Sequence, residues 1–285
     1  QRSQFRHVIL VTVGQIGGVD GAQKIGPATQ IIGIVDAVEL DGKVVSAAII
    51  RKVRSAIDAH VAAGGRRPGL AVVLVGDDPA SAIYVNAKRR DCEKAGILTQ
   101  DYDLPASTSQ EDLLALIDRL NDSPETDGIL VQLPLPDHVD ESKVLEAISP
   151  AKDADGFHPY NVGRLVTGNP LYQPCTPFGV MKMLEHTGVD LTGKDVVVVG
   201  RSNIVGKPVA LMCLAQHATV TLCHSRTRDL PAKVGQADVR VEVPQVAGQA
   251  GHLGRRHAPQ GLDLLLHHVV GHVPQLHQRM AAGQA

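Results

Sequence analysis

Short apolar runs typical of buried strands alternate with helix-like segments through the middle of this chain. The strand-like runs are Leu70–Val75 and Gly128–Leu133 in a first block, and Asp195–Val199 and Ala218–Cys223 in a second. Strands that alternate with helices form parallel sheets, because each helix carries the chain back to begin the next strand in the same direction. We therefore predict an α/β fold of two domains, each built around a parallel sheet.

The helix-like segments repeat their apolar residues every three to four positions, which is typical of helices with one buried face. They are Val45–Ala63, Ser81–Lys94, Gln110–Leu120, Pro177–His186 and Gly206–Gln216. The stretch from about Gly163 to Pro177 is rich in Gly and Pro, so we interpret it as a linker. The predicted domains are residues 37–162 and residues 163–239.

Both ends of the chain lack this pattern. Residues 1–36 are rich in Gly, Val and Ile without a clear period, and residues 240–285 hold six of the 13 histidines but only two acidic residues. We interpret residues 1–36 as an atypical N-terminal extension and residues 240–285 as a divergent His-rich tail that need not be ordered. Because the tail begins inside a strand, at about Val239–Val241, we expect the second sheet to stop there with an exposed edge.

The composition argues against several classes of protein. With 28 Lys and Arg against 30 Asp and Glu, the net charge of -2 provides no basic surface for nucleic acid or an anionic membrane. No apolar run reaches the roughly 18 residues of a membrane span. The four cysteines have no CxxC spacing, so we expect neither a disulfide framework nor a metal site. These features favour a cytoplasmic protein that binds a small molecule.

One candidate site begins where the first predicted strand passes into a helix. Ser81, Tyr84 and Lys88 are spaced i, i+3 and i+7, which places them on one helical face, with Ser81 as a plausible N-cap. Open α/β sheets bind ligands at the carboxyl ends of their strands, and this face points there. A Tyr ring beside a Lys ammonium could hold a flat substrate and transfer a proton or activate water. The alternative is a helix cap, a half-buried Tyr and a solvated Lys.

Two further polar residues lie beside apolar segments. Gln132 ends a buried strand and needs a hydrogen-bond partner, which is either Lys88, which it would orient, or a neighbouring loop. Asp155 lies in the turn Lys152–Gly156, where it could accept paired N–H donors from a heterocycle or form an Asx-turn before Gly156. Both alternatives remain open for each residue.

The second block contains a candidate dinucleotide site. A run of four valines leads into the Gly-bounded loop and helix start Gly200–Pro208. Such a loop places backbone N–H groups and a helix dipole against a pyrophosphate. After the next strand, His224–Arg226 stands where an NAD-preferring site would place an acidic residue. Together with Arg201, this segment offers a hydroxyl and cations to a 2′-phosphate, so the sequence favours NADP over NAD.

Six motifs in order identify a family. They are DGKxVS at Asp41–Ser46, VGDDPASxxYVxxK at Val75–Lys88, GILVQLPLP at Gly128–Pro136, KDADGF at Lys152–Phe157, PCTPxGV at Pro174–Val180 and GRSxIVGKPVA at Gly200–Ala210. Over about residues 40–238 the chain resembles the bifunctional methylenetetrahydrofolate dehydrogenase/methenyltetrahydrofolate cyclohydrolase family (FolD type).

The resemblance implies a folate-binding catalytic domain at residues 37–162 and a Rossmann-type NADP-binding domain at residues 163–239. It implies oxidation of 5,10-methylenetetrahydrofolate with NADP, followed by hydrolysis of the methenyl product to 10-formyltetrahydrofolate. These reactions belong to one-carbon metabolism and supply purine biosynthesis. It also implies a homodimer that needs no metal.

Roles carried over from the family follow the matching positions. Lys88 resembles the catalytic lysine of the hydrolysis, Tyr84 the residue that stacks on the folate, and Gln132 the residue that positions the lysine. Asp155 resembles the carboxylate that recognises the pterin, and Ser81 belongs to the same pocket. The implied cofactor residues are Gly200, Arg201, Ser202, Ile204, Gly206 and Ser225. Of these, Arg201 and Ser225 are implied to bind the 2′-phosphate.

The chain departs from the family after about Asp238. Family members continue with two further strands, a Gly- and Pro-rich loop that closes on substrate and cofactor, and a terminal helix. Residues 240–285 contain none of these motifs, as a shifted reading frame would produce. The alternative function is therefore a catalytically impaired folate- and nucleotide-binding protein. Another Rossmann-type NADP dehydrogenase is a third hypothesis, but it leaves Tyr84 and Lys88 unexplained.

Overall fold

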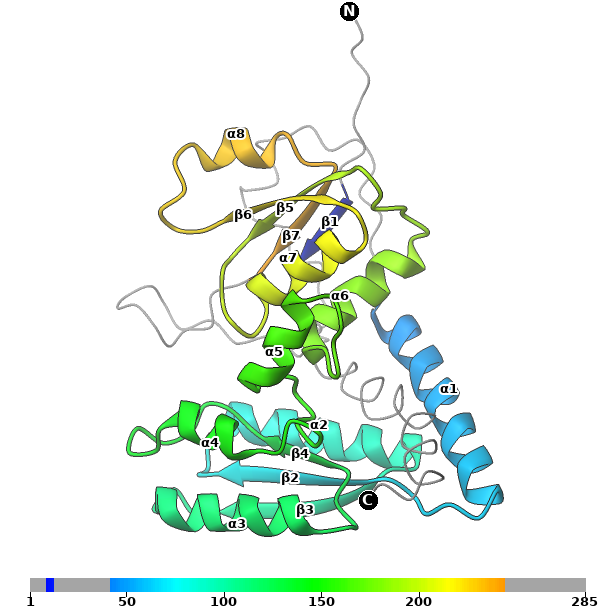
Figure 1. Ribbon diagram of the computed structural model, residues 1–285, viewed down its shortest axis with the longest axis vertical. Coiled ribbons are helices and arrows are strands. Elements are labelled where there is room, and N and C mark those ends of the chain that lie inside the picture. The colour runs from blue at the N-terminus through cyan, green and yellow to red at the C-terminus, as the bar shows by residue number, and fades with distance from the viewer. Residues whose placement is uncertain (1–8, 13–41, 244–285) are drawn as a thin grey trace, which may run out of the picture. The chain divides into compact units, whose positions relative to one another are not determined.

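The computed structural model describes residues 9–12 and 42–243 of the chain. These residues divide into two units, one formed by residues 43–175 and the other by residues 9–12 and 176–243. Each unit contains a parallel sheet with helices packed against it (Figure 1). This arrangement confirms the predicted two-domain α/β fold. No helix in the described part of the chain combines the length and the apolar character that crossing a membrane requires.

The first unit has a three-stranded sheet in the order β3-β2-β4. Its strands β2 (Gly69–Val75), β3 (Leu98–Leu104) and β4 (Gly128–Val131) are all parallel. Every residue of β2 and β4 is buried, which explains their continuous apolar sequences. The helices are α1 (Gly42–Ala62), α2 (Pro79–Ala95), α3 (Gln110–Asp122), α4 (Glu141–Ala147) and α5 (Pro159–Val166).

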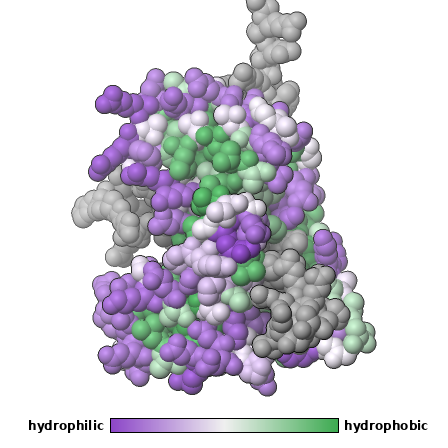
Figure 2. All heavy atoms as spheres, in the orientation of Figure 1, coloured by the Kyte–Doolittle hydropathy of each residue, from purple (hydrophilic) through white to green (hydrophobic). Residues whose placement is uncertain are grey.

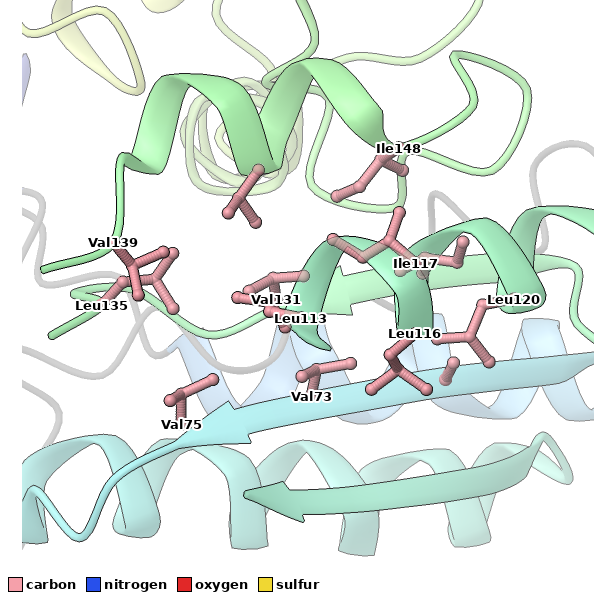
Figure 3. Close-up of a cluster of buried hydrophobic side chains, with 13 residues drawn as sticks. Val73, Val75, Leu113, Leu116, Ile117, Leu120, Val131, Leu135, Val139 and Ile148 are labelled. Atoms are coloured by element: carbon pink, nitrogen blue, oxygen red, sulfur yellow. The ribbon is translucent and has the colours of Figure 1, made fainter. Parts of the chain in front are cut away.

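The core of the first unit forms where α3 packs on the sheet. Its buried residues on α3 recur at the spacing of one helical face, and Figure 3 shows them meeting side chains of β2 and β4; they are Leu113, Leu116, Ile117 and Leu120. Ser109 caps this helix by accepting the backbone N–H of Asp112 at 3.0 Å. Truncating a buried leucine here to alanine would cost about 2–5 kcal/mol. This packing fixes the carboxyl ends of β2 and β4, where the candidate active-site residues follow.

The second unit has a four-stranded parallel sheet in the order β1-β7-β5-β6. The strands are β1 (Ile9–Thr12), β5 (Asp195–Val199), β6 (Thr219–Cys223) and β7 (Val239–Glu242). The helices are α6 (Cys175–His186), α7 (Gly206–Ala215) and α8 (Leu230–Val234). Val196 and Val198 of β5 join one apolar cluster, whereas Val197 joins another with Val234 of α8. Strand β5 is therefore buried on both faces, as central strands of parallel sheets are.

The expectation that the second sheet stops at Val239–Val241 with an exposed edge is wrong. These residues form β7, which pairs with β5 through Val196 and, on its other side, with β1 through Ile9. The covering strand β1 lies within residues 1–36, interpreted from the sequence as an extension. The four residues of β1 are too few to show a period, and their partner strand lies more than 200 positions away along the chain. The other residues of the extension, and residues 244–285 of the tail, lie outside the described residues.

The sequence missed several elements for a common reason. Strand β3 is an edge strand whose side chains are mostly exposed or half-buried, so Leu98–Leu104 shows no continuous apolar run. Helices α4, α5 and α8 are short, which leaves the helical period little room to appear. The stretch interpreted as a linker begins inside α5 and ends inside α6.

Candidate active site

Helix α2 begins directly after the turn that follows β2. Asp78 is its N-cap, and its carboxylate accepts the backbone N–H of Ser81 at 2.7 Å. The prediction that Ser81 is the N-cap is therefore wrong: Pro79 occupies the first helical position, where its fixed φ fits, so the helix begins earlier. Ser81 instead lies buried in the first turn, on the face that carries Tyr84 and Lys88.

The structure brings Lys88 and Gln132 together. The Lys88 Nζ donates to Gln132 Oε1 at 3.2 Å, while Gln132 Nε2 donates to the carbonyl oxygen of Leu133 at 2.6 Å. The backbone N–H of Gln132 donates to the Val73 carbonyl at 2.9 Å, which ties this residue to the end of β2. Gln132 thus bonds both to Lys88 and to the backbone of the loop that follows it, the two alternatives that the sequence left open. They fix the amide so that its oxygen faces the ammonium.

The loop after α4 contains two carboxylates in different environments. Asp153 is buried, and its carboxylate accepts hydrogen bonds from backbone N–H groups at 2.9–3.2 Å; the donors are Gly156, Phe157 and His158. The Asx-turn weighed for Asp155 is absent from the described loop: the side-chain bonds to its backbone N–H groups come from Asp153 and reach three to five residues on. Asp155 is partly exposed and makes no hydrogen bond to the rest of the described chain. Its carboxylate oxygens are available to a ligand.

Charged and ionisable groups influence one another at this site. Burial raises the pKa of the Asp155 carboxyl, Lys88 opposes that rise, and the negative charge of Asp153 adds to it. Burial also raises the pKa of the Tyr84 phenol, so the ring is neutral at ordinary pH. Lys88 and Asp155 thus lie close enough to influence one another, and Tyr84 lies on the same helical face as Lys88.

Cys175 lies beside this region without offering reactive chemistry. Its Sγ donates to the Ala154 carbonyl at 3.3 Å. Burial raises the pKa of the thiol well above its ordinary value, and the charge of Asp155 raises it further. A thiol that stays protonated is a poor nucleophile.

In the second unit, the loop after β5 folds back on itself. Gly200 has φ of +128°, and a side chain there would meet Val243. A Cβ on Gly206 would collide with the carbonyl oxygen of Gly200. Both positions therefore require glycine, and the closed loop brings the strand end against the start of α7. Ile204 lies partly buried within it.

Ser202 has a local role that the sequence did not predict. Its Oγ accepts the backbone N–H groups of Val205 and Gly206 at 3.2 and 3.1 Å, and its carbonyl accepts that of Lys207 at 3.0 Å. Pro208 has no N–H to offer. The first N–H groups of α7, expected to face a pyrophosphate, are thus already hydrogen-bonded within the chain. A cofactor phosphate must be bound mainly by other groups of this loop.

Arg201 and Ser225 are exposed at the same edge of the sheet. They follow β5 and β6, which are paired neighbours, and the N–H of Gly200 donates to the Cys223 carbonyl at 2.8 Å. The turn that carries Ser225 is shaped by His224, whose Nδ1 accepts the N–H of Arg226 at 3.1 Å. A guanidinium and a hydroxyl at one edge fit a phosphate monoester.

No group of three or more His, Cys, Asp or Glu side chains within the described ranges is arranged to hold a metal ion.

Comparison with known proteins places these two sites in a family. The family model described as the tetrahydrofolate dehydrogenase/cyclohydrolase catalytic domain matches residues 40–155, and its NAD(P)-binding domain matches residues 174–254. A bifunctional protein FolD from Geotalea daltonii is 65% identical over 200 residues, which cover 70% of this chain and 71% of that protein.

Solved structures agree with this comparison. FolD from Campylobacter jejuni superposes with a TM-score of 0.70 at 47% identity, covering 71% of this chain and 72% of that one. The Trypanosoma brucei FolD, a complex with NADP and an inhibitor, has a TM-score of 0.70 at 39% identity, covering 73% and 71%.

Proposed function

Since this chain belongs to the tetrahydrofolate dehydrogenase/cyclohydrolase family and is a dehydrogenase and cyclohydrolase that uses NADP, we propose how its residues divide the two reactions. The first oxidises 5,10-methylenetetrahydrofolate to the methenyl form, and the second hydrolyses that product to 10-formyltetrahydrofolate. The observation that carries the division is the Lys88–Gln132 hydrogen bond beside the free carboxylate of Asp155.

Binding of the folate falls to Tyr84 and Asp155. The neutral ring of Tyr84 provides a flat surface for stacking on the pterin. The ionised carboxylate of Asp155, which lacks a hydrogen bond within the described chain, accepts paired N–H donors of the heterocycle. Ser81, buried on the same helical face, adds a hydroxyl to this pocket.

Hydrolysis of the methenyl group falls to Lys88. Its ammonium group donates a proton to N5 as the bond between N5 and the bridging carbon breaks, and the amine then regains a proton from the water that attacked this carbon. Gln132 holds the Nζ through its amide oxygen, and its own amide nitrogen is fixed by the Leu133 carbonyl. The lysine is thus oriented before substrate arrives, which lowers the entropic cost of reaching the reactive geometry.

The cofactor is held by the loop after β5 and the turn after β6. Bound NADP supplies the hydride acceptor for the oxidation. The glycines Gly200 and Gly206 keep the loop closed, and Ser202 and Ile204 give it its shape. Arg201 and Ser225 bind the 2′-phosphate by charge-assisted hydrogen bonds.

The same proposal covers the extent of the domains, residues 37–162 and 163–239. The family matches at residues 40–155 and 174–254 and the two compact units support it. It also covers a cytoplasmic location, supported by four cysteines that are all buried and free. No feature of the described residues favours the impaired alternative.

The proposal further includes a homodimer. Strand β6 stands at the end of the sheet order β1-β7-β5-β6, and Figure 2 shows hydrophobic surface over β6 and α7. Leu222 and Leu214 on these elements are exposed. An edge strand with apolar side chains favours pairing with a second copy. Light scattering should give twice the mass of the chain, and the mass of a single chain at working concentration would contradict the dimer.

A coupled absorbance assay tests the enzymatic proposal. The intact chain is mixed with 5,10-methylenetetrahydrofolate and either NADP or NAD. We expect reduced cofactor with NADP, a transient methenyl absorbance, and 10-formyltetrahydrofolate as the final product. Reaction with NAD should be slower, because NAD has no 2′-phosphate for Arg201 and Ser225 to bind. Bound folate and bound NADP without any reduced cofactor would contradict the proposal.

A further inference from the structure

Asp155 is flanked by two anchored pieces of chain. On its N-terminal side, the N–H of Ala154 donates to the Ile129 carbonyl at 3.2 Å, and the N–H of Ile129 donates to the Lys152 carbonyl at 2.7 Å. The segment thus runs parallel to β4 through a bridge between Ile129 and Asp153. The Lys152 ammonium adds bonds to carbonyl oxygens at the end of α3. Residues 152–154 are fixed to the sheet and to α3.

The His158 ring adds one bond, to the Glu146 carbonyl at 3.2 Å, but the C-terminal side of Asp155 is fixed mainly by the carboxylate of Asp153. Its Oδ1 accepts from Gly156 and Phe157, and its Oδ2 accepts from His158 at 2.9 Å. The Nδ2 of Asn161, in α5, also donates to Oδ2 at 2.8 Å. Four N–H donors therefore converge on one carboxylate that is only 2% exposed. A buried carboxylate is tolerated only with such compensation.

A neutral side chain cannot replace this carboxylate. An asparagine has one acceptor oxygen, and its amide group would face two N–H donors, those of His158 and Asn161. Loss of those bonds frees the backbone after Gly156, because this glycine, at φ of +69°, does little to restrict its own conformation. The position of Asp155 therefore depends on the charge and both oxygens of Asp153.

We propose that Asp153 is a positioning residue for the folate site, which holds Asp155 in place to accept the N–H groups of the pterin without touching the substrate itself. The inference rests on the proposed function of Asp155. It assigns the two acidic residues of the KDADGF motif different tasks. Asp153 holds the loop in its conformation, and Asp155 binds the pterin.

The charge of Asp153 also acts on Asp155. The Cys175 thiol, at the start of α6, is itself affected by Asp155, whose own carboxyl is influenced by Lys88 of α2 and Asp153 of its own loop. Of these, Asp153 raises the pKa of Asp155 and Lys88 lowers it. Removing the Asp153 charge therefore lowers the pKa of Asp155, so folate binding should survive to a lower pH.

The experiment compares Asp153→Asn with Asp127→Asn in the full chain. Asp127 is a matched control, because its carboxylate is also buried and accepts a backbone N–H, that of Gly69 at 2.8 Å, but it lies just before β4, away from the carboxyl end of that strand. For Asp153→Asn we expect the KM for methenyltetrahydrofolate to rise about 10- to 100-fold, the scale of misplacing a binding group. The kcat should change far less, and the acid limb of kcat/KM should move to lower pH. NADP affinity should not change.

The control separates positioning from folding. Asp127→Asn should lose stability, as measured by Tm, with KM and the acid limb as in the wild type. An Asp153→Asn protein that folds with wild-type KM, or that resembles the control in both readouts, overturns the inference.

If Asp153→Asn does not fold, the KM of Asn161→Ala is measured instead, since this substitution removes one of the four donors to Asp153. A KM increase of a few-fold supports the inference, and an unchanged KM overturns it. An inactive wild type would instead overturn the proposed function.

Discussion

The two units differ in how their functional side chains are held. In residues 43–175, the polar groups of the site are fixed by one another, as Gln132 fixes Lys88 and Asp153 fixes the loop of Asp155. In residues 176–243, Arg201 and Ser225 are exposed, and the local bonds serve to close the loop around Ser202. The chemistry therefore depends on side chains fixed in advance, whereas cofactor recognition depends on charge presented at a surface. Substitutions in the first unit should change folate binding or the rate of hydrolysis, whereas those at Arg201 and Ser225 in the second should change NADP affinity.

The largest effect is expected from Lys88→Met. Because it removes the group that transfers a proton, hydrolysis of methenyltetrahydrofolate should fall by about 10²–10⁴-fold, with folate affinity largely retained. The decay of methenyl absorbance measures this rate. Arg90→Met on the same helix is the control, since Arg90 is exposed. Unchanged hydrolysis in Lys88→Met would remove the proposed role.

Arg201→Ala should weaken NADP binding by roughly 1.5–3 kcal/mol, the scale of hydrogen bonds to a charged group, with little effect on NAD. Titration calorimetry with each cofactor measures the difference. Lys233→Ala, which changes an exposed cation of α8, serves as the control. Equal losses for both cofactors would show that Arg201 supports the loop instead of recognising the 2′-phosphate.

Tyr84→Ala should weaken folate binding by roughly 1–3 kcal/mol, because the stacking surface is lost. Tyr84→Phe keeps the ring and should bind folate nearly as the wild type does. A fluorescence titration distinguishes the variants. If Phe and Ala weaken binding equally, the hydroxyl and not the ring carries the interaction.

Strand β1 offers a test confined to the second unit. Leu10→Pro together with Val11→Pro removes two backbone N–H groups from a four-residue strand. Because β1 lies at the edge of the sheet, only one of these two neighbouring N–H groups faces β7; the hydrogen bond lost there contributes about 0.5–1.5 kcal/mol, so the second unit should unfold at a lower temperature. Hydrolysis by the first unit should persist below that transition. A thermal transition identical to that of the wild type would mean that β1 does not stabilise the sheet.

The smallest effect concerns the stability of the first unit. Burial raises the pKa of Asp155 above 3.8, so the ionised carboxylate destabilises the fold at neutral pH. Asp155→Asn should therefore increase the free energy of unfolding while weakening folate binding. The gain should be absent below pH 3.8, grow as the pH rises through the raised pKa, and then stay constant. Denaturant unfolding across this range checks the sign, and a gain that shrinks with rising pH would contradict it.

The sequence predicted some of these features better than others. Spacing placed Tyr84 and Lys88 on one face, and the need of a buried amide for a partner pointed from Gln132 to Lys88. The separate roles of Asp153 and Asp155 could not be predicted, because both carboxylates lie in the same short turn and only their hydrogen bonds in the folded protein distinguish them. The pairing of β1 with β7 was equally hidden, since it joins segments from opposite ends of the chain.

The separation of tasks between the units is tested most directly by two measurements on the same three proteins. The hydrolysis rate of supplied methenyltetrahydrofolate and the Kd for NADP are measured for the wild type, Lys88→Met and Arg201→Ala. We predict that Lys88→Met loses hydrolysis and keeps NADP affinity, whereas Arg201→Ala loses NADP affinity and keeps hydrolysis. A substitution that lowers both quantities in a folded protein would contradict the account.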